Sequence, residues 1–174
     1  MHSTFESLEA LRPDLKPLFR QLRKVPAERI SRMRQAHPEC PESYWQFLSE
    51  RGSGPLEQDG TPFTFEEELL SAERDVFGDD EIYSNGAKGD LLLFGYESMG
   101  VYYGFDTGKQ WGLVEVDEFR IVTPMHLSFE EFVVGLVLCY PQIAIKVQGG
   151  KWFDANGNSY RLGPPMSALG SVQG

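Results

Sequence analysis

The chain has 174 residues, of which 41% are apolar and 13% aromatic, and its net charge is −10. This composition excludes a wholly disordered chain, and the length suffices for one domain that buries a core without disulfides. The acidic balance repels phosphate backbones, which disfavours general nucleic-acid binding. The sequence has two cysteines, no secretory leader and no apolar run of membrane-spanning length, so we expect a cytoplasmic protein without a disulfide framework.

The charge is distributed unevenly along the chain. Residues 1–37 carry eight basic and four acidic side chains, residues 38–131 carry five basic and 21 acidic side chains, and residues 132–174 carry three basic and one acidic side chain. The middle of the chain therefore holds all of the excess negative charge. Such a surface serves solubility alone or attracts a basic partner, and composition leaves both interpretations open.

Short helices are predicted in the first part of the chain. A capping box over 3–6 precedes apolar residues at helical spacing, and prolines end this helix near Leu11. A short turn over 17–24 and a basic helix over 27–36 follow.

The segment 41–52 predicts a further helix. Pro41 suits its first position, apolar side chains share one face, and Gly52 suits a left-handed C-terminal stop. The segment 61–70 is ambiguous, because it begins like a strand while 66–72 could be helical.

From residue 90 onward the pattern changes to short strands separated by turns. Short connections force consecutive strands to be antiparallel neighbours. The predicted strands are 91–95, 100–106, 111–116 and 119–122. The segments 53–60 and 78–89 are predicted as loops, and the second of these is acidic.

A second capping box over 128–131 starts a helix that Pro141 ends. Its wide apolar stripe is expected to lie across the sheet. The helix residues predicted for the core are Phe129, Phe132, Leu136 and Tyr140. Their expected partners are Val101, Tyr103 and Phe105, or the neighbours of these residues on the opposite face.

The C-terminal part of the chain predicts a β-hairpin. Asn156-Gly157 stands between two aromatic-rich arms, which is a strong signal for a two-residue turn. The surrounding Asp and Asn residues are similar to a calcium loop, but the glycine falls two places early and no bidentate Glu follows.

The sequence contains no motif for catalysis or metal binding. It has neither a Gly-x-Ser-x-Gly elbow nor a phosphate-binding loop. His2, His37 and His126 have no partner at metal-ligand spacing, so we interpret them as surface or capping residues. Cys40 precedes a helix N-terminus, which stabilises a thiolate, but no base partner is evident. We therefore expect a protein without catalytic residues, metal or cofactor.

Three stretches of the sequence carry a family resemblance. The spacing of Pro, Tyr, Phe-Leu and Gly over 41–54 resembles the opening signature of the SUKH superfamily, which includes SMI/KNR-like proteins. The segments 94–95, 101–106 and 112–114 look like the central hairpin strands of that superfamily. The Ser-Phe-x-x-Phe pattern over 128–132 is similar to its closing helix.

This resemblance covers residues 26–140 and implies an α+β fold. The implied architecture is an antiparallel-rich sheet with helices packed on one side. The N-terminal helices 1–25 and a C-terminal hairpin and tail over 141–174 are extensions of a single domain. The segment 51–54 departs from the usual Asn-Gly-Gly loop of the superfamily.

The resemblance also implies a function that needs no catalytic residue. Bacterial members of the superfamily are widely immunity proteins that bind and neutralise a cognate toxin, often a nuclease, whereas fungal members regulate cell-wall synthesis through protein partners. Our leading hypothesis is thus an immunity-type, non-catalytic protein-binding module. A housekeeping adaptor or cell-wall-synthesis regulator is the alternative, and an Asp/Glu-dependent hydrolase is the third hypothesis.

The acidic middle segment supplies the candidate partner-binding residues. Six carboxylates within sixteen residues are proposed to attract a basic toxin domain: Glu66, Glu67, Glu68, Asp79, Asp80 and Glu81. Neither nucleic acid nor a membrane is expected as a partner. Charge reversal at Glu67 and Asp80 is expected to slow association and to leave the melting temperature unchanged or slightly higher.

Overall fold

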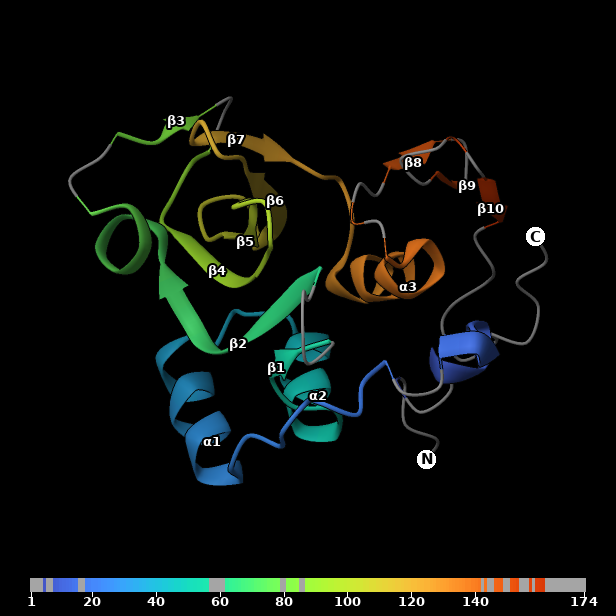
Figure 1. The fold of residues 1–174 in the computed structure, drawn as a ribbon. Coiled ribbons are helices and arrows are strands. Elements are labelled where there is room, and N and C mark those ends of the chain that lie inside the picture. The colour runs from blue at the N-terminus through green and yellow to red at the C-terminus, as the bar shows by residue number, and fades with distance from the viewer. Residues whose placement is uncertain are drawn as a thin grey trace.

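The computed structural model describes residues 5, 8–15, 18–56, 62–78, 81–84, 87–141, 143, 146–148, 151–153, 157 and 159–161. Across this part of the chain the fold is α+β, as predicted, with helices beside a predominantly antiparallel sheet. Figure 1 shows a strongly curled sheet, with α1 (Ala27–Ala36) and α2 (Glu42–Glu50) below it and α3 (Phe129–Cys139) beside it.

The main sheet has seven strands within the described residues, in the order β1-β2-β4-β5-β6-β7-β3. Their bounds are β1 (Gly54–Pro55), β2 (Phe63–Ser71), β3 (Tyr83–Ser84), β4 (Leu91–Glu97), β5 (Tyr102–Asp106), β6 (Gly112–Val116) and β7 (Ile121–Pro124). All neighbours are antiparallel except β3, which pairs in parallel with β7. The predicted meander is confirmed as β4 to β7, although β5 begins at Tyr102 and not at residue 100, and β7 begins at Ile121 and not at residue 119.

The ambiguous segment 61–70 is a strand from Phe63 onward. The helical alternative over 66–72 is wrong, because β2 pairs with β4 near both of its ends. Helical geometry follows only in the π-helical turn η3 (Ala72–Phe77). The predicted loop 53–60 also contains a short strand, β1, which is held in place by its pairing with the beginning of β2.

The three α-helices pack on one face of the sheet, and α3 supplies the centre of the core. The α3 residues predicted for the core are all buried: Phe129, Phe132, Leu136 and Tyr140. The ring of Phe132 lies 5.2 Å from that of Tyr103, and the ring of Phe129 lies 6.1 Å from that of Phe105. The predicted packing is therefore confirmed, except that Val101 stays partly exposed.

The predicted capping box at the start of α3 is also confirmed. The Ser128 hydroxyl accepts a hydrogen bond from the backbone N–H of Glu131, and the Glu131 carboxylate accepts one from the backbone N–H of Ser128, both at 3.1 Å. These two bonds satisfy donors that the first turn of the helix leaves without intrahelical partners.

The opposite face of the sheet carries a second, smaller apolar cluster. Its buried members are Ala72, Leu91, Leu93, Val114, Val116 and Val122. Side chains of η3 and the partly buried Ile82 pack against this cluster. The prediction that helices cover one side thus holds for α1 to α3, while η3 and the segment before β3 cover part of the other side.

The N-terminal segment is attached to α3. Two 3₁₀ helices form there, η1 (Leu8–Leu11), which ends where predicted, and η2 (Pro13–Leu15). Between them, the Arg12 guanidinium donates hydrogen bonds to the carbonyl oxygens of Leu138, at 3.0 Å, and Tyr140, at 3.1 Å. A cation at these orphan carbonyls also complements the negative end of the helix dipole.

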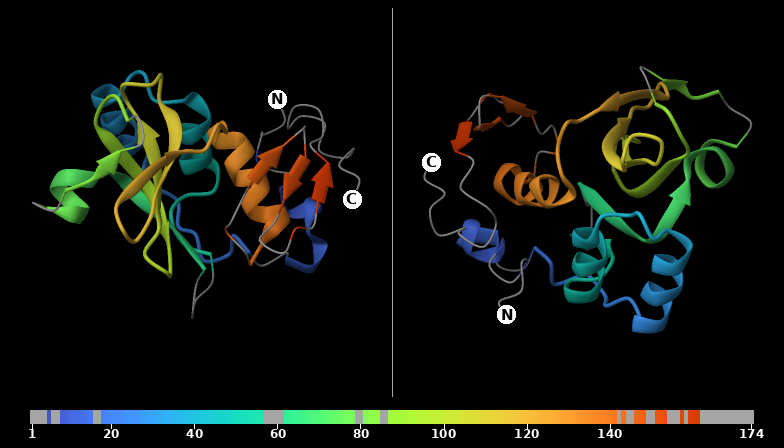
Figure 2. Two further views of the ribbon diagram at one scale, coloured as in Figure 1. Left: turned by 90° about the horizontal axis from the view of Figure 1, so that it is seen from above. Right: turned by 180° about the vertical axis from the view of Figure 1, so that it is seen from behind.

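A separate three-stranded antiparallel sheet forms from β8 (Lys146–Gln148), β9 (Lys151–Phe153) and β10 (Ser159–Arg161). The pairing of β9 with β10 confirms the predicted hairpin, whose turn residue Asn156 lies outside the described residues. Figure 2 shows this sheet beside α3 and far from α1.

Candidate partner-binding surface

Glu66, Glu67 and Glu68 lie in an irregular stretch of β2. Phe65 is opposite Gly95 on β4, and the next paired residue of β2 is Leu70, opposite Leu93. The intervening residues therefore form a wide bulge rather than regular pairs. On its other side β2 pairs with β1 only at Thr64 and Phe65, so the bulge has no strand partner there within the described residues. The three glutamates consequently lie at a sheet edge.

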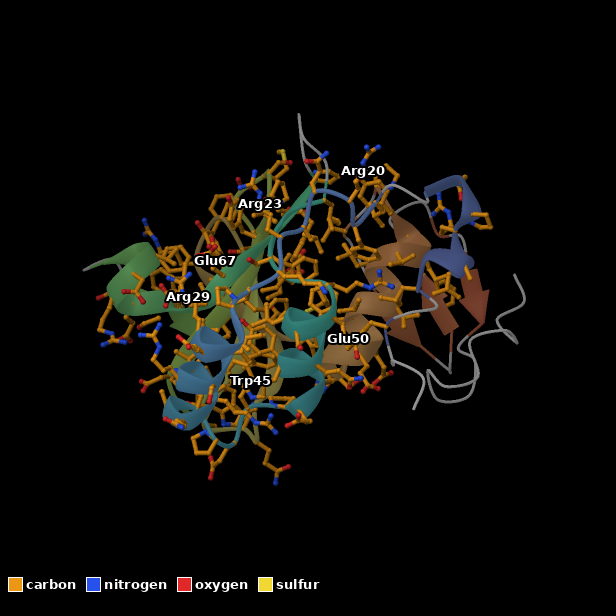
Figure 3. The ribbon with its side chains drawn as sticks, turned by 90° about the horizontal axis from the view of Figure 1, so that it is seen from below. Arg20, Arg23, Arg29, Trp45, Glu50 and Glu67 are labelled. Atoms are coloured by element: carbon orange, nitrogen blue, oxygen red, sulfur yellow. The ribbon has the colours of Figure 1, made fainter. Side chains whose placement is uncertain are left out.

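One of these carboxylates forms an ion pair within the protein. The guanidinium of Arg29 on α1 donates to the Glu67 carboxylate, and Figure 3 shows the two residues side by side. The side chains of Arg29 and Glu67 are 40% and 64% exposed, and such a solvent-accessible pair stabilises by about 1 kcal/mol or less. Charge reversal at Glu67 would place a second cation beside the Arg29 guanidinium. We therefore expect a small decrease in melting temperature, in place of the unchanged or slightly higher value expected from the sequence.

The neighbouring Glu66 is in an environment that disfavours its charge. Burial raises the pKa of Glu66, and the carboxylates of Glu67 and Glu68 raise it further. Glu66 in turn contributes to the raised pKa of Tyr102 on β5, where burial is the largest cause. A half-buried carboxylate among like charges is stabilised in its ionised form when a cation approaches it.

The second half of the predicted acidic site is only partly described. Asp79 and Asp80 lie outside the described residues. Glu81 is exposed and precedes β3. Four strands separate β2 from β3 in the sheet order, so the structure does not bring Glu81 into the same cluster as Glu66.

Between the β2 bulge and Glu81 lies an aromatic ridge, which consists of Tyr96, Tyr102 and Phe77. The ring centroids of Tyr96 and Tyr102 are 5.5 Å apart, and those of Tyr102 and Phe77 are 5.7 Å apart. The guanidinium of Arg120 lies 6.0 Å from the centroid of the Phe77 ring. This ridge was not predicted from the sequence. Strand alternation contains a signal for it, because Tyr102 must face away from the buried Tyr103.

A cavity of about 190 Å³ opens on the same side of the sheet. Its lining residues are Ser71, Glu73, Ile82, Ala87, Gly89, Asp90 and Leu91. No histidine or cysteine is among them, and the volume is smaller than typical sites for small organic ligands. We assign no chemistry to this cavity.

The residues weighed for metal or thiol chemistry are dispersed in the described structure. His126 is exposed, whereas His37 packs against Trp111, and burial lowers the pKa of His37. His2 lies outside the described residues. Burial raises the pKa of Cys40, and Glu42 adds to this, so the expected thiolate stabilisation at the helix N-terminus is wrong.

The described residues contain no group of three or more His, Cys, Asp or Glu side chains placed to hold a metal ion. They also contain no helix that is both long enough and apolar enough to cross a bilayer.

Comparison with protein-family models, with curated proteins and with solved structures finds no match for this chain. The resemblance to the SUKH superfamily therefore stays a prediction from the sequence.

Proposed function

We propose that this chain is a protein-binding protein that binds a basic protein partner through an acidic surface. This acidic surface consists of the β2 bulge, with Glu66, Glu67 and Glu68, and of Glu81 before β3. The observation that supports this most directly is the bulge of β2, where Glu66, Glu67 and Glu68 are held together at a sheet edge. Only Glu67 has an ion-pair partner among the described residues.

The physical basis is relief of like-charge repulsion. Glu66 is half-buried beside two carboxylates, which costs the free protein stability. A lysine or arginine supplied by a partner would offset that cost through charge-assisted hydrogen bonds. The acidic middle of the chain would also accelerate encounter with a basic surface at low ionic strength.

The resemblance to the SUKH superfamily suggests which partner this is. Nuclease toxins carry basic surfaces because they bind nucleic acid, and an acidic immunity protein would cover such a surface. In this proposal the protein acts in the cytoplasm, needs no cofactor, and binds neither nucleic acid nor a membrane. A housekeeping adaptor or cell-wall-synthesis regulator would use the same surface for a different basic protein. A toxin gene adjacent to the gene for this chain would favour the immunity role.

The proposal is tested by binding kinetics with the partner recovered from the source cell. The test variant combines Glu68→Lys with Glu81→Lys, both exposed positions without an ion pair in the described structure. The control combines Glu28→Lys with Glu39→Lys, which changes the total charge equally on the side of α1.

We expect the test variant to associate at least tenfold more slowly than the control at low salt, and the difference to shrink as salt screens the charges. Equal association rates for the two variants at low salt would show that the proposed acidic surface is not the interface.

A further inference from the structure

The large apolar side chains that remain exposed gather at one end of the sheet. Among the described residues these are Tyr83, Met99, Phe119 and Ile121, with exposed fractions of 57%, 74%, 69% and 38%. We call these four residues the apolar tip.

The strand register brings the four residues together. Tyr102 on β5 is opposite Val116 on β6, so the β4–β5 turn with Met99 and the β6–β7 turn with Phe119 extend from the same end of the sheet. Ile121 follows the second turn and pairs with Tyr83 on β3. Figure 1 shows β3 beside β7 on the side of the sheet away from α1 and α2.

The turn that carries Phe119 is held by several hydrogen bonds. The Asp117 carboxylate accepts hydrogen bonds from the backbone N–H groups of Phe119, at 2.9 Å, and Ile121, at 2.8 Å. The backbone N–H of Arg120 donates to the carbonyl of Asp117, and the N–H of Tyr83 donates to the carbonyl of Arg120. Because these bonds fix the turn, its backbone loses little conformational entropy when the exposed ring enters a pocket.

Carboxylates flank the apolar tip. Glu97 ends β4, Asp117 and Glu118 begin the β6–β7 turn, and Glu81 precedes β3. The basic residue of this turn is Arg120, whose guanidinium lies near the ring of Phe77. Phe77 belongs to the aromatic ridge, which connects the tip with the surroundings of Glu66. The surface thus has an apolar centre, an acidic rim and continuity with the bulge of β2.

We infer that the apolar tip is the hot spot of the partner interface, with Phe119 inserted into an apolar pocket that lysine and arginine surround on a basic protein. This inference rests on the proposed function and identifies where its binding energy is concentrated. An apolar aromatic centre inside a charged rim is the usual organisation of such interfaces. The acidic rim and the net charge of −10 oppose association of two copies of the chain through this surface.

The first experiment locates the contact in the source cell. A photo-crosslinking amino acid replaces Glu118 in the full chain, which leaves Phe119 intact, and the control replaces the exposed Gln35 on α1. We expect a basic protein to be crosslinked from position 118 and not from position 35.

The second experiment measures the affinity of that purified protein for the Phe119→Ser variant. We expect at least a tenfold weaker Kd, mainly through faster dissociation, with an unchanged melting temperature because the ring is exposed. The matched variant Gln35→Ser should bind as the wild type does.

The outcomes separate this inference from the proposed function. If Glu68→Lys with Glu81→Lys slows association with a basic partner but Phe119→Ser leaves its Kd unchanged, the inference fails and the proposed function stands. If neither variant affects any basic partner, both fail. A crosslink to a second copy of the chain, or sedimentation with phosphatidylcholine vesicles that Phe119→Ser abolishes, would overturn the inference in favour of a different occupant.

Discussion

The buried carboxylate of Asp106, at the end of β5, accepts a hydrogen bond of 2.9 Å from the backbone N–H of Gly89. The same carboxylate accepts bonds from the backbone N–H groups of Lys88, at 2.9 Å, and Gly108, at 3.0 Å. Asp106 therefore joins the end of the acidic segment before β4 to the turn between β5 and β6. This connection holds Lys88 and Gly89 in place directly before β4.

We expect Asp106→Ala to lower the free energy of unfolding by about 3 kcal/mol, because three backbone donors lose the buried carboxylate that accepts from them. Asp106→Asn should cost less, since its amide oxygen can still accept. Urea unfolding would measure both values. The neighbouring Asp90→Ala is the control, with an expected change within about 0.5 kcal/mol because its side chain is exposed. Similar costs at positions 106 and 90 would contradict the assigned role.

Phe132 lies at the centre of the aromatic core. Its fully buried ring contacts those of Phe63, Phe94 and Tyr103, with centroid distances of 5.7, 5.4 and 5.2 Å. We expect Phe132→Ala to cost about 3–5 kcal/mol in denaturant unfolding. The chemically identical change Phe119→Ala should cost less than about 1 kcal/mol, because its ring is exposed. A loss below 1 kcal/mol at Phe132 would refute the packing.

Local sequence patterns predict most of the main sheet and miss two features of it. The strands β4 to β7 follow from alternating apolar residues and short turns, and α3 follows from its capping box and apolar stripe. The bulge of β2 is not predictable in this way, because three consecutive glutamates suit a helix surface as well as a strand edge. The two-residue strand β3 gives no periodic signal, since its parallel pairing with β7 depends on contacts far apart in the sequence.

Local sequence patterns also predict only part of the candidate site. The sequence identifies the carboxylates Glu66, Glu68 and Glu81 as charged and clustered, but the sheet order separates Glu81 from the other two. It also gives no reason to select Phe119, because an aromatic residue at a predicted strand start is usually expected to be buried. Its exposure follows from the turn that Asp117 fixes, which moves the start of β7 to Ile121.

Glu66 should make stability depend on pH in a defined direction. Burial raises its pKa in the folded protein, so the folded state binds the proton more tightly than the unfolded state does. The stability that this group contributes is full below its unfolded pKa and is lost as the pH rises through its folded pKa. Glu66→Gln removes this loss and should melt at a higher temperature than the wild type at pH 7.

The difference between Glu66→Gln and the wild type should disappear below about pH 4, where the wild-type carboxyl is protonated in both states. Melting curves between pH 3.5 and 8 would measure it. Glu39→Gln, at an exposed position on the turn before α2, is the control and should show little difference across this range. A Glu66→Gln effect that is constant with pH would exclude desolvation of the carboxylate as its cause.

A side chain at Gly52, which follows α2, should destabilise the fold for two reasons, its backbone angle and a steric overlap. Its φ is +93°, and a Cβ atom built there would lie 2.1 Å from the carbonyl oxygen of Arg23. Arg23 and Ser53 exchange two backbone hydrogen bonds of 2.8 and 2.9 Å at this point, which fasten the segment before α1 to the end of α2. Gly100 has a similar φ of +87°, but a Cβ atom there would meet nothing within 4 Å.

The two glycines therefore separate backbone strain from steric overlap. Gly100→Ala should cost about 1–2 kcal/mol, the strain of a left-handed alanine. Gly52→Ala should cost about 3 kcal/mol or more, because backbone atoms must also move apart. Denaturant unfolding would give both values, and hydrogen exchange of the Arg23 and Ser53 amides should accelerate in Gly52→Ala alone. Equal costs and unchanged exchange would show that the approach of Arg23 to Gly52 does not constrain the fold.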